Sequence, residues 1–225
     1  MKVKSGDTPP ARRTQAERTA ATRARLVNSA RKLFADKGFS AVSTEAIATA
    51  AGVTRGALYH QFEDKAALFT AVYEEVEREL VADVAGRIVA IGPGDQLQAM
   101  RIGAQLFLDL CSAPAVQQIV LIDAPAVLGW EKWRAVGVKY GLGVIETMLG
   151  QAIADGVIPE QPVRPTAHVL LGALDEAALY ISRATDAEDA RTQMYAVCDR
   201  VIAGIAARDV EALPAPGLKR SRRRP

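Results

Sequence analysis

The stretch that most constrains the fold lies near the N-terminus, where three short segments with helical spacing of apolar residues follow one another almost without linkers. The first segment, from about Thr22 to Lys37, places apolar residues at i, i+4, i+7 and i+8, namely Leu26, Ala30, Leu33 and Phe34. Gly38 follows it as a C-cap glycine would, and Lys37 places a cation in the last turn. We therefore expect a helix that ends at Gly38.

The next two segments predict a pair of short helices joined by a tight turn. Ser43 is placed to cap a helix over residues 44–51, and Thr54 is placed to cap another over residues 55–62. Gly52 separates the two helices. Their apolar residues, which we expect to be buried, are Ile47, Ala48, Ala51, Leu58 and Phe62. Two short helices around a glycine-containing turn are typical of a helix-turn-helix unit.

In a helix-turn-helix unit the second helix enters the major groove of DNA. The residues that we expect to bind DNA are Ser43, Thr44, Thr54, Arg55, Gly56, Ala57, Tyr59, His60 and Lys65. Arg55 can reach guanine edges, and the small Gly56 and Ala57 let the helix approach the bases. Tyr59 and His60 can donate to phosphates, and Lys65 at the start of the next helix points toward the same backbone. The alternative is a generic three-helix bundle with a polar surface, but turn, caps and spacing agree on the helix-turn-helix.

The same residues resemble a known family. The stretch STEAIATAAGVTRGALYHQFEDKAALF is similar to the DNA-binding core of TetR/AcrR-type transcriptional regulators. The likeness rests on Gly38-Phe39, on Ile47-Ala48 followed by Ala51-Gly52-Val53, and on Leu58-Tyr59-His60-Gln61-Phe62 before Lys65, and it covers about the first third of the chain. The resemblance implies an all-helical homodimer of two-domain subunits that binds a palindromic, inverted-repeat DNA operator and releases it when a small molecule binds.

The whole chain of 225 residues is predicted to be all-α, because 49% of it is hydrophobic and its long segments show helical rather than alternating spacing. We expect a flexible basic arm over residues 1–15, a helix-turn-helix DNA-binding domain over 16–65, a helical ligand-binding and dimerisation domain over 66–210, and a disordered basic tail over 211–225. No apolar run reaches the roughly 18 residues of a membrane span, and the N-terminus lacks a signal-peptide core. We expect a cytoplasmic protein with no membrane partner.

The formal net charge of +2 hides an uneven distribution. Residues 1–62 hold 11 Lys and Arg against 4 Asp and Glu, and the tail from Pro214 holds 5 basic residues and no acidic one. Residues 63–213 hold 12 basic and 22 acidic residues. A basic end joined to an acidic body favours approach to nucleic acid with one end. Whether the arm and the tail themselves contact DNA, or are only solvated termini, stays open.

Further helices are expected in the body. One begins at Lys65 and connects the DNA-binding end to the body, and Asp95 caps another that reaches about Cys111, with Ile102, Leu106 and Leu110 inside. A short apolar segment over 116–122 should end at Pro125. A long helix over 130–154 contains Gly137, Gly141 and Gly143, which indicate close approach by another helix or by a ligand, since each glycine costs about 1 kcal/mol in a helix.

The last two predicted helices, 166–183 and 189–207, carry more apolar surface than a terminal hairpin needs. Their apolar residues are Leu170, Leu174, Ala177, Ala178 and Ile181, and Met194, Val197, Val201, Ile202 and Ile205. A four-helix interface between two copies would bury this surface, so we expect a homodimer.

The body is also the candidate sensor of a small, largely apolar effector. The residues that we expect to line its pocket, with ordinary core packing as the alternative for each, are Phe107, Cys111, Trp130, Trp133, Tyr140, Met148 and Asp175. Asp175 interrupts an apolar face, and a buried carboxylate needs a partner. That partner is a ligand donor, an arginine of the other subunit, or water.

Catalysis and metal binding have little support in the sequence. The two histidines, His60 and His168, have no Cys or Ser in a triad-like context, and Cys111 and Cys198 have neither zinc nor disulfide spacing. Asp175 and Glu176 are adjacent, so on a helix they point about 100° apart. We expect no enzyme activity, no metal and no cofactor. A purely architectural DNA binder is a further alternative, but it would not need the long apolar body.

Overall fold

The computed structural model describes residues 14–91 and 95–207, and these form helices with no strand among them. The helices are α1 (Gln15–Ala41), α2 (Thr44–Ala50), α3 (Arg55–Gln61), α4 (Lys65–Ile91), α5 (Gln96–Cys111), α6 (Pro114–Val116), the π-helix η1 (Gln117–Asp123), α7 (Ala124–Leu128), α8 (Trp130–Ala154), α9 (Val163–Arg183) and α10 (Ala187–Ala206). The predicted all-α fold is confirmed. Most of the predicted basic arm, and the whole predicted tail, lie outside the described residues.

Helix α1 begins well before the predicted residue Thr22. Thr14 is its N-cap: the Thr14 hydroxyl accepts the N–H of Glu17 at 3.2 Å, and the Glu17 carboxylate accepts the N–H of Thr14 at 2.7 Å. This capping box pairs two N–H groups that a helix start would leave free, and it explains the earlier start. The predicted break at Gly38 is confirmed, because this residue has φ 75° and ψ 160° inside α1.

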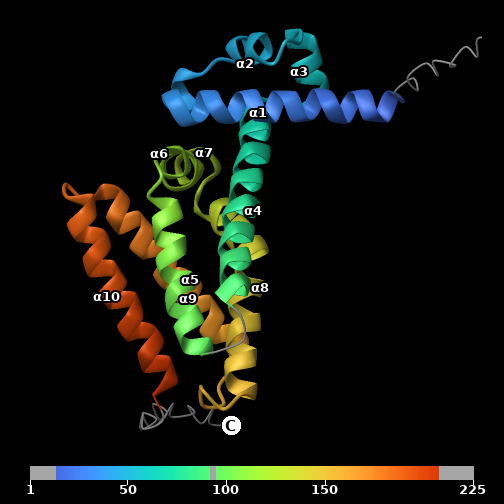
Figure 1. The fold of residues 1–225 in the computed structure, drawn as a ribbon. Helices are drawn as coiled ribbons and strands as arrows, with labels where there is room; N and C mark the ends of the chain where they lie inside the picture. The colour runs from blue at the N-terminus through green and yellow to red at the C-terminus, as the bar shows by residue number, and fades with distance from the viewer. Residues whose placement is uncertain (1–13, 92–94, 208–225) are drawn as a thin grey trace, which may run out of the picture.

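Helix α4 joins the two halves of the molecule. Helix α1 lies across the start of α4, and α2 and α3 lie on the far side of α1 (Figure 1). The rings of Phe34, Phe39 and Phe69 meet where α1 crosses α4, with ring centroids 5.2–5.6 Å apart. The first half of α4 therefore belongs to the core of the N-terminal unit, while its second half runs down into the body.

Helices α5, α8, α9 and α10 form most of the body beside α4 (Figure 1). The residues of α5 that are buried are Met100, Gly103, Ala104, Leu108 and Cys111, whereas the predicted Ile102, Leu106 and Leu110 are only half-buried. The prediction selected the wrong face of α5, because Gly103, on the face that is buried, has no apolar side chain to indicate it. A Cβ on Gly103 would lie 2.9 Å from the Cδ1 atom of Ile88 on α4, so any larger residue would require the end of the Ile88 side chain to shift.

The chain between residues 114 and 128 differs from the expected short segment. It continues as α6, η1 and α7, and Pro125 lies in the first turn of α7 instead of ending a helix. A proline is tolerated there because an N–H in the first turn has no partner within its helix. The seven residues of η1 form a π-helix, a rare conformation that is often found at functional sites.

The predicted bounds of α8 are confirmed, but two of its glycines have neighbours only at ordinary van der Waals distance. A Cβ on Gly137 would lie 3.9 Å from the Glu77 carboxyl, and one on Gly141 would lie 3.4 Å from Leu171. Gly143 faces open space, so no close neighbour explains it.

Helices α9 and α10 form a hairpin whose apolar residues divide between the inside and the surface. Leu170, Ala177, Ala178 and Ile181 are buried within the subunit. Of the nine exposed large apolar side chains among the described residues, four lie on this hairpin: Val169, Tyr180, Val197 and Val201.

No single described helix has the length and hydropathy of a membrane span. The bent helix pair 96–111 and 114–128 meets these criteria by length and composition alone.

Candidate functional site

The helix pair α2 and α3 is capped as the sequence predicts. The Ser43 hydroxyl accepts the N–H of Ala46 at 3.1 Å, and the Thr54 hydroxyl accepts the N–H of Ala57 at 3.1 Å. Leu58 is fully buried beneath α3. These caps and this anchor fix the direction in which the outer face of α3 points.

That outer face consists of Arg55, Gly56, Tyr59 and His60, which are exposed, with Ala57 half-buried. The Arg55 guanidinium lies 5.5 Å from the centroid of the Tyr59 ring, and the Tyr59 hydroxyl lies 3.3 Å from the hydroxyl of Thr44 on α2. Hydrogen bonds from Thr44 and Arg55 lower the pKa of Tyr59. The contacts tie the side chains of α2 and α3 into one exposed polar surface.

Lys65 has a structural role that the sequence analysis missed. Its ammonium donates to the carbonyl oxygens of Phe39 at 2.9 Å and of Val42 at 3.0 Å, and it lies 4.0 Å from the centroid of the Phe39 ring. Two of its three donors are therefore used inside the N-terminal unit. The predicted contact of Lys65 with the DNA backbone stays a prediction, with one donor left for it.

Phe39, which accepts a hydrogen bond from Lys65, also donates one to a residue of the body. Its N–H donates to the buried carboxylate of Asp123, the last residue of η1, at 2.7 Å. A Cβ on the neighbouring Gly38 would lie 3.2 Å from the side-chain amide of Gln118, so η1 packs directly against the break in α1. The N-terminal unit is thus connected to the body both through α4 and through η1.

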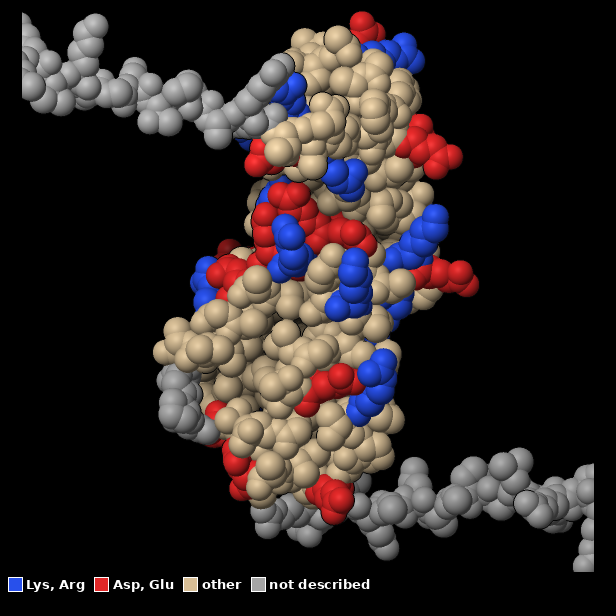
Figure 2. Space-filling model, turned by 90° about the vertical axis from the view of Figure 1, so that its right-hand side faces the viewer, with Lys and Arg blue, Asp and Glu red and all other residues tan. Residues whose placement is uncertain are grey.

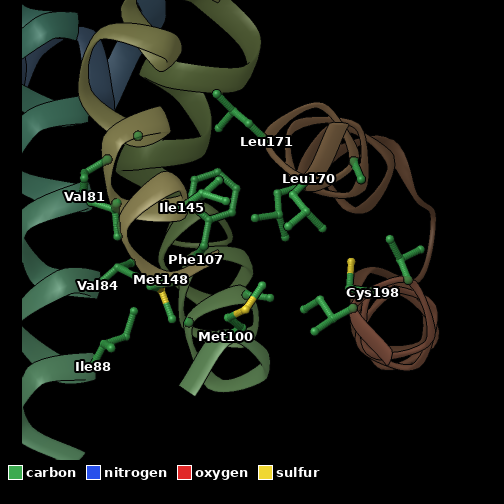
Figure 3. Close-up of a pocket in the computed structure, with 18 of the residues that line it drawn as sticks. Val81, Val84, Ile88, Met100, Phe107, Ile145, Met148, Leu170, Leu171 and Cys198 are labelled. Carbon is green, nitrogen blue, oxygen red and sulfur yellow. The ribbon is translucent and has the colours of Figure 1, made fainter. Parts of the chain in front are cut away.

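The body contains an apolar cavity of about 90 Å³ between α4, α5, α8, α9 and α10 (Figure 3). Val81, Val84 and Ile88 of α4 line one side of it, and Leu170 and Leu171 of α9 line another. Of the seven residues predicted to line a pocket, Phe107 and Met148 do so. Leu174 and Val201, expected at the dimer interface, also line this cavity.

The other five predicted residues do not line the cavity, for reasons that differ. Trp133 is buried and its indole N–H donates to the carbonyl of Val120 in η1 at 2.9 Å, while Trp130 is 60% exposed. Tyr140 is half-buried beneath the ammonium of Lys139, which lies 4.8 Å from the ring centroid. Cys111 is buried in the core of the body.

Asp175 has the partner that its burial requires, and that partner lies in the same subunit. The Arg134 guanidinium donates to the Asp175 carboxylate at 2.6 Å. Burial raises the pKa of Asp175 to about 6, against the opposing effect of the Arg134 charge. The Asp175 carboxyl is therefore mostly ionised at pH 7.

Glu77 is the polar residue of the cavity that the sequence analysis missed. It is 6% exposed, and burial together with the Asp175 charge raises its pKa to about 7. The sequence held a signal for it, because Glu77 falls on the same helical stripe as Tyr73, Val81 and Val84. Like Asp175, Glu77 is a carboxylate on an apolar helix face, and its burial requires a partner for the same reason.

The face of the molecule seen in Figure 2 carries no large patch of a single charge. Acidic and basic side chains lie side by side around its middle. Within residues 14–91 and 95–207, no group of three or more His, Cys, Asp or Glu could hold a metal ion. The exposed face of α3 and the cavity remain as the two candidate sites.

Known proteins resemble this chain over both halves. The family described as bacterial regulatory proteins, tetR family, matches residues 26–72, and the family described as tetracyclin repressor-like, C-terminal domain, matches residues 97–205. The crystal structure of a TetR-family transcriptional regulator from Pectobacterium atrosepticum has 30% sequence identity and a TM-score of 0.76, over 87% of this chain and 98% of that one.

Two further relatives extend the comparison. The transposon Tn10 TetC protein of Escherichia coli is 25% identical over 183 residues, which are 81% of this chain and 91% of that protein. The crystal structure of RolR in complex with its ligand resorcinol has 19% identity and a TM-score of 0.68, over 89% of this chain and 100% of that one. At that identity, the likeness to RolR shows a shared fold alone.

Proposed function

Because the chain belongs to the TetR family of transcriptional regulators, we propose that it is a repressor that binds an inverted-repeat operator as a homodimer and leaves it when a small molecule enters the cavity. Members of this family bind DNA and small-molecule effectors and are regulators of transcription, not enzymes. The observation that carries the proposal is that one helix, α4, begins directly after the capped helix pair, packs against α1, and lines the apolar cavity with its second half. We place this activity in the cytoplasm, where bacterial DNA is accessible.

On the DNA side, we assign residues 16–65 to the DNA-binding domain, whose core the first half of α4 completes, and 66–210 to the effector and dimerisation domain. Helix α3 enters the major groove, and Arg55 contacts a guanine. Thr44, Tyr59, His60 and Lys65 contact the phosphates around it. The remaining predicted residues act through the backbone and by allowing close approach: Ser43, Thr54, Gly56 and Ala57.

On the effector side, the apolar lining favours a small, largely apolar molecule. RolR, which shares the fold, was solved with resorcinol as its ligand, and we extend the use of a small organic ligand to this cavity. Among the predicted contacts, we retain Phe107 and Met148. For Cys111, Trp130, Trp133, Tyr140 and Asp175 we propose packing or pairing roles around the cavity instead.

The two sides communicate through α4 and η1. Lys65 and Glu77 are 12 residues apart on α4, which is about 18 Å along a helix. A ligand that displaces the second half of α4 relative to η1 strains the paired contacts of Phe39 with Lys65 and Asp123. The N-terminal unit then tilts, and the spacing of two recognition helices in a dimer no longer matches half-sites about 34–36 Å apart.

The dimer forms through the outer face of the α9–α10 hairpin. Val169, Ala173, Glu176 and Tyr180 follow at i, i+4, i+7 and i+11 on α9, and Val197 and Val201 lie on α10. The four large apolar side chains among them are exposed in the single subunit, and a second copy would cover them.

A gel-shift titration with the Arg55→Ala variant tests the DNA-binding proposal. On an operator enriched from random duplexes, the loss of the guanine contact should cost about 1–3 kcal/mol of binding free energy and relax the base preference at that position. Arg78→Ala removes the same charge from an exposed position on α4 and is the matched control. Equal affinity and equal base preference of Arg55→Ala and wild type would refute the proposed docking of α3.

A further inference from the structure

We propose that the cavity selects apolar molecules that carry one basic nitrogen, and that the Glu77 carboxylate binds the resulting cation. As an account of the effector, this inference rests on the proposed function, whereas the binding of a cation in the cavity can be tested without DNA. It assigns a chemical class to the ligand and a recognition residue that the apolar lining alone does not supply.

The first support is the position of Glu77. Its side chain lies among the lining residues of the cavity, on the same stripe of α4 as Val81 and Val84, and it is 6% exposed. All other lining residues are uncharged, so Glu77 alone gives the cavity an ionisable carboxyl group. A ligand that fills the cavity must therefore either pair with this group or leave it buried and unpaired.

The second support is that Glu77 has no partner within the described chain. Its carboxyl makes neither a hydrogen bond nor an ion pair with any described residue, although buried carboxylates are ordinarily paired. Two other carboxylates in the body differ in this respect: the half-buried Asp175 pairs with Arg134, and the buried Asp123 accepts the N–H of Phe39. The pattern leaves one buried carboxyl group among the lining residues of the cavity without a partner in the described chain.

The third support is the charge balance of the surroundings. On α8 and α9, Arg134 and Asp175 compensate one another. On α4, α5 and α10, burial raises the pKa values of Tyr73, Cys111 and Cys198, so these groups are neutral at pH 7. An ionised Glu77 is thus the one uncompensated charge in this set, and a monocation neutralises it. An anionic ligand would meet Glu77 and the nearby Asp175 as like charges.

The fourth support is that the ionisation of Glu77 can respond to a ligand near neutral pH. Burial and the Asp175 charge raise the pKa of Glu77 to about 7. Near pH 7, without a ligand, the Glu77 carboxyl is therefore protonated and ionised in comparable amounts. A cation favours the ionised form and lowers this pKa. Binding of an amine should therefore strengthen as the pH rises through about 7.

A neutral molecule that accepts a hydrogen bond from protonated Glu77 is the competing possibility, and it predicts the opposite pH dependence. Its affinity would fall above pH 7, when Glu77 loses its proton. Molecules of equal length and different head groups separate the two cases. We choose n-octylamine, 1-octanol and octanoate, since the amine stays protonated over the whole range of pH 6–8.

Isothermal titration calorimetry of the full chain with the three probes at pH 6 and pH 8 gives the test. At pH 8 we expect the amine to bind at least about 10-fold more tightly than the alcohol, and octanoate most weakly, because a charge-assisted pair is added in the cavity. From pH 8 to pH 6 the affinity for the amine should fall about 10-fold, as Glu77 becomes mostly protonated. The affinity for octanol should not fall in this direction.

The Glu77→Gln variant keeps the size of the side chain and removes its charge. We expect it to bind the amine about 10- to 100-fold less tightly at pH 8, to lose the pH dependence, and to keep its affinity for octanol, which shows that the cavity is intact. Glu75→Gln removes the same charge from the same helix outside the cavity lining and should bind like wild type. Equal binding of the amine by wild type and Glu77→Gln would overturn the inference, as would failure of the amine to bind wild type more tightly than octanol does.

Operator binding in the presence of each probe separates this inference from the proposed function. If the amine binds in a Glu77-dependent manner but leaves operator affinity unchanged, the assignment of Glu77 holds and release by an effector in this cavity is wrong. If octanol releases the operator as well as the amine does, release stands and the selection of a cation is wrong.

Discussion

Glu77 carries its carboxyl group into a region where water solvates the charged form poorly, so its ionisation opposes folding. Its pKa is about 7 in the native protein and near the ordinary 4.5 when unfolded, so the native state binds the proton more tightly. The resulting loss of stability is absent below about pH 4.5, grows as the pH rises, and is complete above about pH 7, where it reaches about 3 kcal/mol.

The Glu77→Gln variant should therefore be more stable than wild type at pH 8 and gain much less at pH 5. We expect a gain of about 1–3 kcal/mol in the free energy of unfolding at pH 8, because a neutral amide costs less to bury than a carboxylate. Urea denaturation at both pH values measures this, with Glu75→Gln as the control. An equal effect at the two pH values would show that the ionisation of Glu77 is not the cause.

Lys65 allows two roles to be separated at the scale of one side chain. Lys65→Met keeps the straight stem but removes the hydrogen bonds to Phe39 and Val42. If the role is structural, the free energy of unfolding should fall by about 1–3 kcal/mol while the salt dependence of operator binding keeps its slope. If Lys65 also contacts a phosphate, the slope should fall by about 0.9. Lys132→Met, at an exposed position of α8, controls for the lost charge.

The sequence located individual residues well where their role is local. The caps Ser43 and Thr54 and the buried Leu58 are all where the sequence predicts them, because capping and short-range amphipathic spacing depend on neighbours along the chain. The cavity residues were predicted less accurately. Phe107 and Met148 line the cavity, whereas the indole of Trp133 donates a hydrogen bond to η1 instead. Which apolar side chain faces a void depends on how five helices pack, and one helix's pattern does not contain that information.

At the scale of elements, the connection between η1 and the break in α1 is the feature with a direct test. Asp123→Ala removes the acceptor of the Phe39 N–H, which lies just after Gly38 where the helix is interrupted. Amide hydrogen exchange at Phe39 should become about 10- to 100-fold faster, since a hydrogen bond to a charged group contributes about 1.5–3 kcal/mol. Asp123→Asn keeps a carbonyl acceptor and should retain most of the protection.

Unchanged amide exchange at Phe39 in Asp123→Ala would mean that the contact between η1 and α1 does not stabilise the interruption of α1 at Gly38.

The π-helical conformation of η1 could not be predicted from the sequence. Its apolar residues, Ile119, Val120 and Leu121, predict a short buried segment, and they are indeed buried, but their spacing does not distinguish a π-helix from an α-helix. The continuation through Pro125 was missed for a related reason, because proline ends one helix and begins another equally well.

At the scale of the whole molecule, the surplus of apolar surface on the last two helices was predicted, but only two of the four exposed residues that carry it were, Val197 and Val201. Leu174 and Val201 line the cavity, so a charge at either position would disturb effector binding as well as any dimer. Val169 and Val197 are 65% and 42% exposed in the single subunit and do not line the cavity. They are the better positions at which to test the proposed interface.

We expect the double variant Val169→Glu, Val197→Glu to be a folded monomer. Both side chains face solvent in the subunit, so a charge there costs little by itself, whereas an interface would bury it without a partner. Sedimentation velocity should show the change from dimer to monomer. Operator affinity should fall about 100-fold or more, because two half-sites are then bound by separate molecules instead of linked ones. Val89→Glu, at a valine of α4 that is 79% exposed, introduces the same change away from the hairpin and should stay dimeric.

The effect on DNA should depend on whether the operator holds one half-site or two. A linked dimer gains affinity from the second half-site only if both recognition helices reach their grooves together, so the double variant should bind an operator with a single half-site as well as wild type does. A variant that loses affinity for the single half-site too would point to damage in the N-terminal unit, and one that remains a dimer would place the interface on another face. A monomer with normal binding to one half-site and weak binding to two would tie the hairpin to operator recognition through dimerisation alone.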